Sequence, residues 1–355
     1  MKLIIRLIAC CCFLTSLAGC SDISLATRRG PQPDRELQWP PLPMPSRITW
    51  VREIGNYRDL GIAKGFWQRV VDFVAGEANA GFGKPYGVFV DDRDRVFIVD
   101  VGLGLIHVMD QPEKLYSVIG AGKVPAFRTP IAVTEDDGNN LYITDAGTGI
   151  VYRYGLESKK LERFSKFLME RPTGITFNRQ NRLLYVSDTA SHQVVVIDMN
   201  GNERMRIGTR GTGPGQFNYP TDLVVDKEGA LYVTDALNAR VQIFSPQGRF
   251  KSSIGKPGDT PGSFAKPKGV AVDSDGHIYV CDAMFDAVQI FDQAGRVLLD
   301  FGSHGAGAGQ FWMPSGLFID KNDFIYVSDS YNRRIQVFKY LKVDEPVTRP
   351  SVSSK

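Results

Sequence analysis

The chain has 355 residues, with 42 lysines and arginines against 39 aspartates and glutamates, and a formal net charge of +3. This near balance lacks the strongly basic surface that nucleic-acid binding requires, so we predict no nucleic-acid partner. A chain of this length would ordinarily hold two or three domains. Repetition in the sequence instead predicts that most of it forms one domain.

Residues 1–19 have the layout of a secretory leader. Two basic residues precede an apolar stretch that is too short to span a bilayer as a stable helix. The stretch ends in LAGC, which resembles the lipobox of bacterial lipoproteins. The resemblance implies that Cys20 is acylated and becomes the mature N-terminus; the alternative is an ordinary leader cut near Ala18. By analogy with Gram-negative sorting, Ser21 predicts a lipid-anchored envelope protein at the outer membrane, facing the periplasm or the cell surface.

Residues 20–46 are predicted to form a Pro-rich tether behind the lipid. They hold six prolines and show no hydrophobic periodicity, which is typical of a semi-rigid linker.

Three of the five cysteines leave with the leader and Cys20 carries the lipid, so Cys281 is the only free thiol and no disulfide forms in the mature chain. Cys281 occupies a position that Ser or Thr holds elsewhere in the repeat, which predicts a buried structural thiol.

From about residue 76 the chain repeats one segment six times, each copy marked by a proline and an aspartate. The markers are Pro85, Pro130, Pro172, Pro220, Pro267 and Pro314, and Asp100, Asp145, Asp188, Asp235, Asp282 and Asp329. Within each copy, short β-branched and aromatic runs with period two alternate with turn signals. Four short antiparallel strands per copy predict an all-β, six-bladed β-propeller, in which each blade covers its neighbours.

The predicted propeller spans residues 47–341, and residues 342–355 form a polar C-terminal tail. The last copy has no convincing fourth strand after its third run. Residues 47–56 resemble the fourth strands of other copies, so we expect them to complete the last blade and close the ring. Residues 64–74 carry apolar side chains at helical spacing, which predicts a short amphipathic helix. The alternative is that residues 69–76 form the closing strand.

The copies resemble the NHL repeat, in which a Pro-x-Gly start and a YVTD run are followed by Asn, Arg and Gln at alternate positions. The fourth copy has Asn238, Arg240 and Gln242 at these positions, and the sixth has Asn332, Arg334 and Gln336. The resemblance covers about three quarters of the chain and implies the propeller fold. It leaves the function open, because NHL propellers serve as lyases, sensors, scaffolds and RNA binders.

Positions that repeat in every copy are expected to serve the blade, and positions that differ are expected to serve function. The six aspartates should accept hydrogen bonds from turn amides, and a phenylalanine three residues before five of the six prolines should pack between blades. The differing positions predict a binding face for a protein partner; the alternative is local packing between loops. The candidate residues of this binding face are Tyr86, Lys268, Met284, Phe285, Trp312, Tyr331 and Arg333.

The sequence gives less support to an enzymatic function. The metal-dependent lyases among these propellers need several histidines around zinc, whereas His107, His192, His277 and His304 fall at four different positions of the repeat. Lactonase-like propellers need a Glu, an Asn and an Asp around calcium in the channel, and Asp222 and Glu170 do not make a recognisable set.

We therefore assign no catalytic residue, metal ligand or cofactor, and leave a structural or channel calcium ion as an open alternative. The leading interpretation is a monomeric, lipid-anchored propeller outside the cytoplasm that binds an envelope protein as a scaffold or sensor. The alternative is a metal-dependent lyase or lactonase-like hydrolase that uses the central channel.

Overall fold

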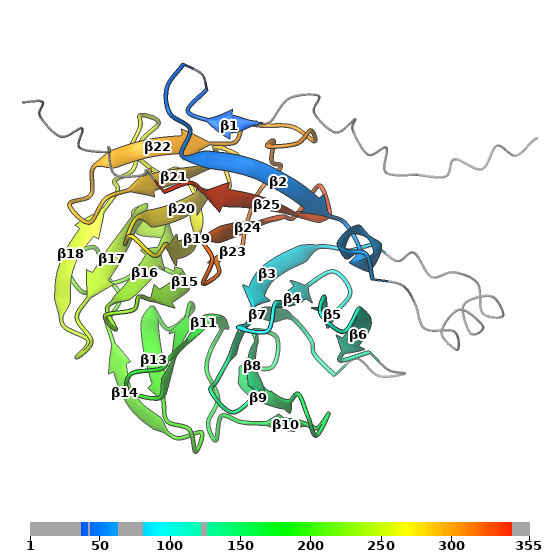
Figure 1. Ribbon diagram of the computed structural model, residues 1–355. Helices are drawn as coiled ribbons and strands as arrows, with labels where there is room; N and C mark the ends of the chain where they lie inside the picture. Colours follow the sequence, from blue (N-terminus) through cyan, green and yellow to red (C-terminus); the bar gives the residue numbers. More distant parts are fainter. Residues whose placement is uncertain (1–36, 42, 63–80, 122–125, 343–355) are drawn as a thin grey trace, which may run out of the picture. The chain divides into compact units, whose positions relative to one another are not determined.

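The computed structural model describes residues 37–41, 43–62, 81–121 and 126–342. Within these residues the chain forms six antiparallel sheets (Figure 1). The first three blades are contiguous in sequence. Blade one comprises β3 (Pro85–Val90), β4 (Arg95–Asp100), β5 (Leu105–Asp110) and β6 (Leu115–Ile119); blade two comprises β7 (Pro130–Glu135), β8 (Asn140–Asp145), β9 (Ile150–Gly155) and β10 (Leu161–Arg163); and blade three comprises β11 (Pro172–Asn178), β12 (Leu183–Asp188), β13 (Gln193–Ile197) and β14 (Glu203–Ile207).

Blades four and five follow the same pattern, whereas blade six takes strands from both parts of the described chain. Blade four comprises β15 (Pro220–Val225), β16 (Leu231–Asp235), β17 (Arg240–Phe244) and β18 (Phe250–Ile254); blade five comprises β19 (Pro267–Val272), β20 (Ile278–Asp282), β21 (Ala287–Phe291) and β22 (Val297–Phe301); and blade six comprises β23 (Leu317–Ile319), β24 (Phe324–Asp329), β25 (Arg334–Tyr340), β2 (Ile48–Ile54) and β1 (Gln38–Trp39). Two short 3₁₀ helices, Tyr57–Leu60 and Ala236–Asn238, are the helices of the described chain.

The sheets form a closed ring around the innermost strands. Each innermost strand contacts the innermost strand of the next blade, and β23 of blade six contacts β3 of blade one. Alternating side chains on both faces of each sheet are buried between neighbouring blades, which gives six hydrophobic clusters, one at each blade interface. This arrangement confirms the predicted six-bladed β-propeller of four-stranded blades.

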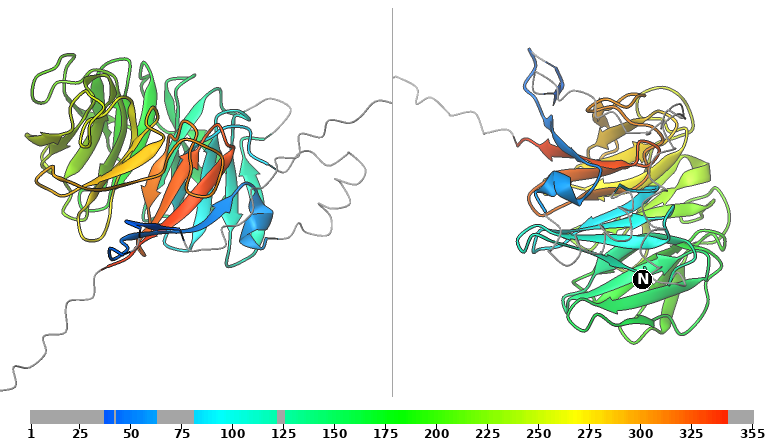
Figure 2. Two further views of the ribbon diagram at one scale, coloured as in Figure 1. Left: turned by 90° about the horizontal axis from the view of Figure 1, so that it is seen from above. Right: turned by 90° about the vertical axis from the view of Figure 1, so that its right-hand side faces the viewer.

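Residues 47–56 close the ring as expected. Strand β2 pairs with β25 from Ile48 opposite Tyr340 to Ile54 opposite Ile335, and both views of Figure 2 show the two strands side by side. The pair is reinforced by Arg334, whose Nη1 lies 2.7 Å from Oε2 of Glu53 on β2. The predicted helix at 64–74 and the alternative strand at 69–76 lie outside the described residues. The closing position beside β25 is held by β2.

The end of the expected tether belongs to the propeller, which corrects the predicted boundary at residue 46. Strand β1 pairs with β2 through Gln38 opposite Thr49 and Trp39 opposite Ile48. The Trp39 ring packs 5.9 Å from Phe301 and 5.8 Å from Phe338, measured between ring centroids. A proline-rich composition predicted a linker, but the half-buried Trp39 packs on the last blade. Backbone hydrogen bonds from the Trp50 amide to Leu37 (2.9 Å) and from the Arg47 amide to Trp39 (2.7 Å) also hold the segment.

The repeated aromatic positions pack between blades. Phe82, Phe127, Phe217, Phe264 and Phe311 are buried, as is Met169 at the same position in blade three. Phe264 packs across Gly255, where an added Cβ would lie 2.2 Å from the phenylalanine ring. Gly255 also has φ +83°, so that position requires glycine for both space and conformation. These contacts confirm that the repeated phenylalanines serve the blades.

Cys281 is fully buried, as predicted, with its thiol directed at the carbonyl of Ser315 in blade six (Sγ to O, 3.4 Å). Burial raises the pKa of this thiol to about 12, so it stays protonated and unreactive at neutral pH.

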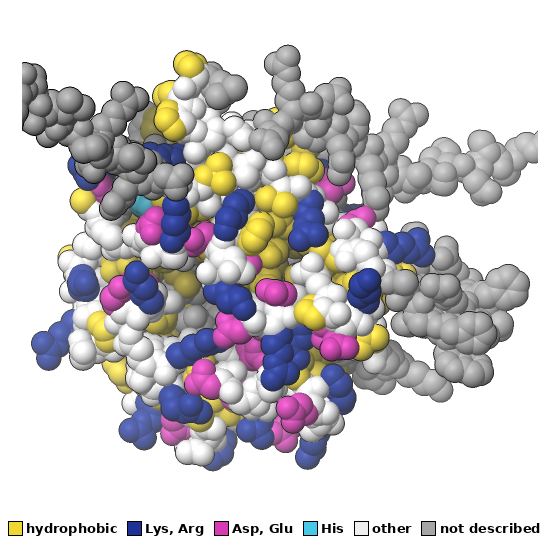
Figure 3. Space-filling view, viewed as in Figure 1, with side chains coloured by type: hydrophobic (Ala, Val, Ile, Leu, Met, Phe, Trp, Pro, Cys, Tyr) yellow, Lys and Arg dark blue, Asp and Glu magenta, His cyan; other side chains and the backbone are white. Residues whose placement is uncertain are grey.

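Basic and acidic side chains are interspersed over the face seen in Figure 3, in keeping with the small net charge. No helix in the described part of the chain is both long and apolar enough to cross a membrane.

Candidate functional site

The candidate site lies on one face of the ring, here named the loop face. It consists of the connections that lead into the innermost strands and the loops between the second and third strands of each blade. The six repeated aspartates end the second strands on this face, where they are fully or almost fully buried. Each accepts a hydrogen bond from one or two amides of the connection, from Gly83 and Lys84 in blade one to Trp312 in blade six. This confirms their predicted role as acceptors for turn amides.

Five innermost strands start at the loop face with the marker proline, and in blades two to five the two residues after this proline bulge out of the ladder. In blade four, Pro220 pairs with Asp235 and the next registered pair is Leu223 with Val233. Two residues on β15 therefore oppose one on β16, which turns Thr221 and Asp222 toward the channel and the next blade. Related register shifts occur at the same place in blades one, two, three and five.

Small residues at the third position bring the innermost strands close together. A Cβ added at Gly316 would lie 2.1 Å from the Tyr86 carbonyl oxygen, and one added at Gly87 would lie 2.5 Å from that of Ile131. The central channel is therefore narrow, with a cavity of about 110 Å³. Pockets that enclose drug-sized ligands are usually several times larger, roughly 300–1,000 Å³. A ligand of that size would bind mainly at the mouth of this channel.

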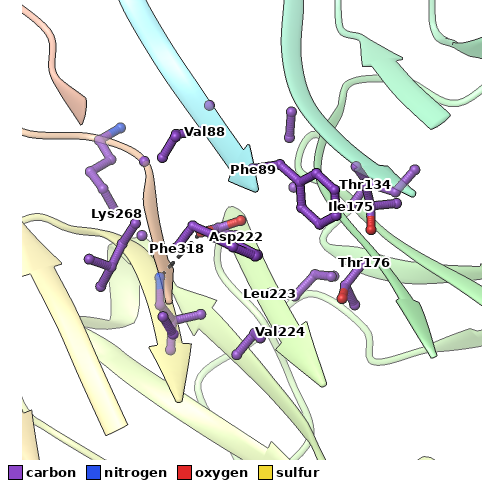
Figure 4. A pocket seen from close by; sticks show the side chains of 18 of the residues that line it. Val88, Phe89, Thr134, Ile175, Thr176, Asp222, Leu223, Val224, Lys268 and Phe318 are labelled. Carbon is purple, nitrogen blue, oxygen red and sulfur yellow. Dashed lines mark hydrogen bonds between the residues drawn. The ribbon is translucent and has the colours of Figure 1, made fainter. Parts of the chain in front are cut away.

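Asp222 is the one carboxylate among the described residues that line the cavity. The other blades have glycine or alanine at its position: Gly87, Ala132, Gly174, Gly269 and Gly316. Figure 4 shows Asp222 in the cavity, and its Oδ2 accepts a hydrogen bond from the Val270 amide of blade five at 3.2 Å. Burial raises the pKa of Asp222 to about 7, so this group exchanges a proton near neutral pH.

The cavity wall beyond Asp222 is mostly apolar, with Thr134 and Thr176 as its polar side chains (Figure 4). Val88, Ile175 and Leu223 line it, and Phe89 packs edge-to-face on Phe318 with ring centroids 5.0 Å apart. Further polar side chains lie at the loop-face end, where Thr173 donates to the Thr221 carbonyl at 2.7 Å. The charged groups of the channel, Asp222 and Lys268, therefore lie toward its mouth.

Tyr86 and Lys268, both predicted site residues, line this mouth and are half-buried. Burial, with a contribution from Asp222, raises the pKa of Tyr86 to about 12, so its hydroxyl remains a neutral donor. Burial and the nearby cations Lys266, Arg171 and Lys84 lower the pKa of Lys268. In Figure 4 the Lys268 amine extends away from Asp222.

The other predicted residues lie in the loops around the mouth. Met284, Trp312 and Tyr331 are 59%, 47% and 49% exposed, and Arg333 is also exposed. Trp312 and Tyr331 form one aromatic pair with ring centroids 5.4 Å apart. Phe285, the remaining candidate residue of the binding face, is half-buried.

Sequence reasoning missed several exposed apolar residues of the same face. Leu103, Leu168, Tyr219 and Leu237 lie in its loops and connections together with the three residues above. It also missed Lys84, Arg171 and Lys266, which directly precede the marker prolines of blades one, three and five. Comparing the residue before each proline across the six copies would have found these cations.

The described residues that line the cavity do not fit a divalent metal centre. They offer one carboxylate and one lysine, and no group of three or more His, Cys, Asp or Glu side chains lies together in the described part of the chain. The four histidines have separate partners: His107 lies 3.3 Å from Asp100, His277 2.8 Å from Asp273 and His304 2.7 Å from Asp286, whereas His192 accepts from the Tyr219 amide at 3.2 Å.

Two family models match parts of the chain. Residues 145–265 match the model described as the SMP-30/Gluconolactonase/LRE-like region, and residues 273–342 match the model described as a 6-bladed beta-propeller. The chain is a six-bladed β-propeller. The matched segments together run from blade two to blade six, so the fold assignment rests on most of the ring.

Solved structures with different descriptions share this fold. Virginiamycin B lyase from Staphylococcus aureus is 14% identical, with 73% of this chain and 96% of that chain covered and a TM-score of 0.54. An auxiliary nutrient binding protein from Bacteroides thetaiotaomicron is 15% identical over 74% of this chain and 71% of that chain, with a TM-score of 0.60. The hydrazine synthase of Kuenenia stuttgartiensis is 13% identical over 76% and 100%, with a TM-score of 0.53. At these identities the likeness shows the fold, and function must be argued from the site.

Proposed function

We propose that this propeller is a binding protein of the cell envelope, anchored by lipid on Cys20, whose loop face binds a protein partner. One observation carries the proposal: seven of the thirteen large apolar side chains that are exposed in the described chain lie on the loop face. Exposed apolar groups gathered on one face usually mark an interaction site. The Asn, Arg and Gln residues around Asp235 and Asp329 further support NHL-type blades.

A scaffold or sensor role is supported better than catalysis in the channel. The cavity is too small to enclose a drug-sized substrate, and the described residues that line it do not provide a metal-ligand set. The aromatic pair of Trp312 and Tyr331, by contrast, has the composition that protein interfaces favour. The binding partner is expected to cover this pair and the exposed side chain of Met284.

The loop face can be tested with matched variants. Trp312→Ala and Met284→Ala should each weaken binding of an envelope partner by roughly 1 to 3 kcal/mol, as interface anchors do. The control is Leu298→Ala on β22, because Leu298 is as exposed (49%) as Tyr331 but lies outside the loop face. The partner is first captured from solubilised envelopes by the wild-type chain, then purified, and its affinity for each variant is measured by calorimetry.

Stability must be followed in the same variants. Trp312→Ala should leave the melting temperature nearly unchanged, whereas Phe264→Ala should cost about 3 to 5 kcal/mol through the cavity that it leaves. If Trp312→Ala unfolds as readily as Phe264→Ala, or if Leu298→Ala weakens binding equally, the loop face is not the binding surface.

The lipid anchor has its own test. Cys20→Ser should leave the protein unlipidated, so that it is extracted from membranes without detergent and takes up no acyl label. Ser21→Ala, which keeps the cysteine, is the matched control and should remain membrane-bound. A Cys20→Ser protein that still takes up the label and sediments with membranes would contradict the anchor.

A further inference from the structure

Three cations stand at equivalent positions in alternate blades around the channel mouth. Lys84, Arg171 and Lys266 directly precede the marker prolines of blades one, three and five, where the other blades have Thr129, Tyr219 and Met313. The backbone amide of each cation donates to the repeated aspartate of its blade, at 2.9, 2.7 and 3.0 Å. Their backbones are therefore held at the same height on three sides of the mouth.

Lys268 of blade five adds a fourth cation within the mouth itself. It lines the cavity and is half-buried. Its pKa is lowered first by burial and then by Lys266, Arg171 and Lys84. The four cations are thus close enough to repel one another, and a bound anion would relieve this repulsion.

These cations have no acidic partner among the ion pairs of the described residues. Lys84 instead lies over the Tyr331 ring, with Nζ 4.8 Å from its centroid. On the opposite face, where turns join the first and second strands, some cations are paired: Arg95 with Glu135 at 3.2 Å and Arg182 with Asp137 at 3.0 Å. The unpaired mouth cations therefore lie on the same face as the exposed apolar side chains.

We propose that the mouth cations, Lys84, Arg171, Lys266 and Lys268, bind an acidic peptide segment of the partner, with a carboxylate directed at Lys268. The inference rests on the proposed function and specifies the chemistry of the partner. Charge complementarity requires an anion, and the surrounding apolar side chains require apolar residues next to it. Lys268 is recessed in the cavity, where a projecting side chain reaches it and the flat surface of a membrane does not.

The test uses the mature protein and two synthetic peptides, one alternating Glu with Leu and one alternating Gln with Leu, each labelled for fluorescence anisotropy. The Glu peptide should bind more tightly, and its affinity should fall as salt is raised, because the contacts are ionic. The triple variant Lys84→Gln, Arg171→Gln, Lys266→Gln should weaken the Glu peptide at least roughly tenfold, since charge-assisted hydrogen bonds are lost. Lys268→Gln alone should weaken it as well.

A variant of equal charge change controls for the general field of the protein. Arg93→Gln, Lys227→Gln, Lys321→Gln removes three cations from the turns of the opposite face, and it should leave the peptide affinity within about twofold, because separated surface charges are screened by salt. Equal weakening by this control would overturn the inference. Equal binding of the two peptides would also overturn it. So would binding to vesicles of phosphatidylglycerol that depends on the mouth cations, if the Glu peptide does not bind.

The native partner separates this inference from the proposed function. If its affinity depends on Trp312 and Met284 but not on the mouth cations, the loop face remains the binding surface and the inference of an acidic segment is wrong. If the affinity depends on neither set, the proposed function itself fails.

Discussion

Blades five and six satisfy the same buried aspartate in two different ways. In blade six, Asp329 accepts from the side chains of Asn332, Arg334 and Gln336 as well as from the Trp312 amide. In blade five, Asp282 accepts from four backbone amides, those of Ala265, Lys266, Met284 and Phe285. The carboxylate and the amides of the connection are thus the constant part of the blade, and the side chains around them can change.

The two blades also differ in how the chain builds them. Blade five is contiguous in sequence, whereas blade six needs β2 and β1 from about 300 residues earlier. In blade six, Arg334 bonds both to Asp329 and to Glu53 on the closing strand. The side-chain network of blade six therefore extends to the closing strand. Blade four has the same network around Asp235 without a closing strand, whereas blade five has Phe285 and Ala287 at the Asn and Arg positions.

The largest effect should follow from removing the closing strand. A chain that starts at Arg58 lacks β1 and β2 and leaves β25 as an open edge, so we expect it to lose cooperative thermal unfolding. A chain that starts at Ser46 keeps β2 but loses Trp39 from the core of blade six, and it should melt between this variant and the mature protein. Differential scanning calorimetry of the three proteins would show equal transitions if closure by β2 contributed nothing.

A smaller loss is expected from the network that blade five lacks. Arg334→Ala removes a buried cation from Asp329 and Glu53 and should cost about 3 to 5 kcal/mol of unfolding free energy, as loss of one partner of a buried pair does. Arg240→Ala removes the equivalent arginine of blade four, which bonds to Asp235 but does not contact the closing strand. Urea unfolding should show a smaller loss of unfolding free energy for Arg240→Ala than for Arg334→Ala. Equal losses would show that Glu53 adds nothing to closure.

The fold could be predicted from the sequence because the repeat supplied six independent copies of the same evidence. The prolines, the aspartates and the phenylalanines recur at fixed positions, and each recurring residue proved to serve the blade. The closing strand was predictable from its likeness to other fourth strands. Strand β1 was not, because two residues in a proline-rich segment carry no periodicity, and their pairing with β2 and the ring contacts of Trp39 appear only in the folded structure.

The candidate site was predicted in part. The positions that differ between copies led to Met284, Trp312 and Tyr331, which are exposed on the loop face. The burial of a side chain could not be predicted from these differences, because Phe285 and Lys268 occupy positions that differ between copies and yet are half-buried. The cations before the prolines form a set only when the blades are arranged in a ring, which places alternate copies around one mouth.

The smallest predicted effect concerns the position where blade four departs from blades five and six, Asp222 in place of Gly269 and Gly316. Burial raises the pKa of Asp222 from 3.8 to about 7. The folded state therefore binds a proton that the unfolded chain has released, so the stability from this group is complete below about pH 4 and is lost as the pH rises through 7. Asp222→Asn stays neutral and keeps an acceptor for the Val270 amide.

The advantage of Asp222→Asn over the wild type should therefore grow by about 2 to 3 kcal/mol between pH 5 and pH 8, since each unit of raised pKa corresponds to about 1.4 kcal/mol. Urea unfolding at the two pH values measures it. Burial also raises the pKa of Glu135 to about 7, but this group titrates in both proteins and cancels in their difference. Tyr86 stays neutral and Cys281 stays protonated over this range because burial raises both pKa values to about 12. A difference that is constant with pH would mean that Asp222 is ionised throughout, with the solvation of an ordinary surface carboxylate.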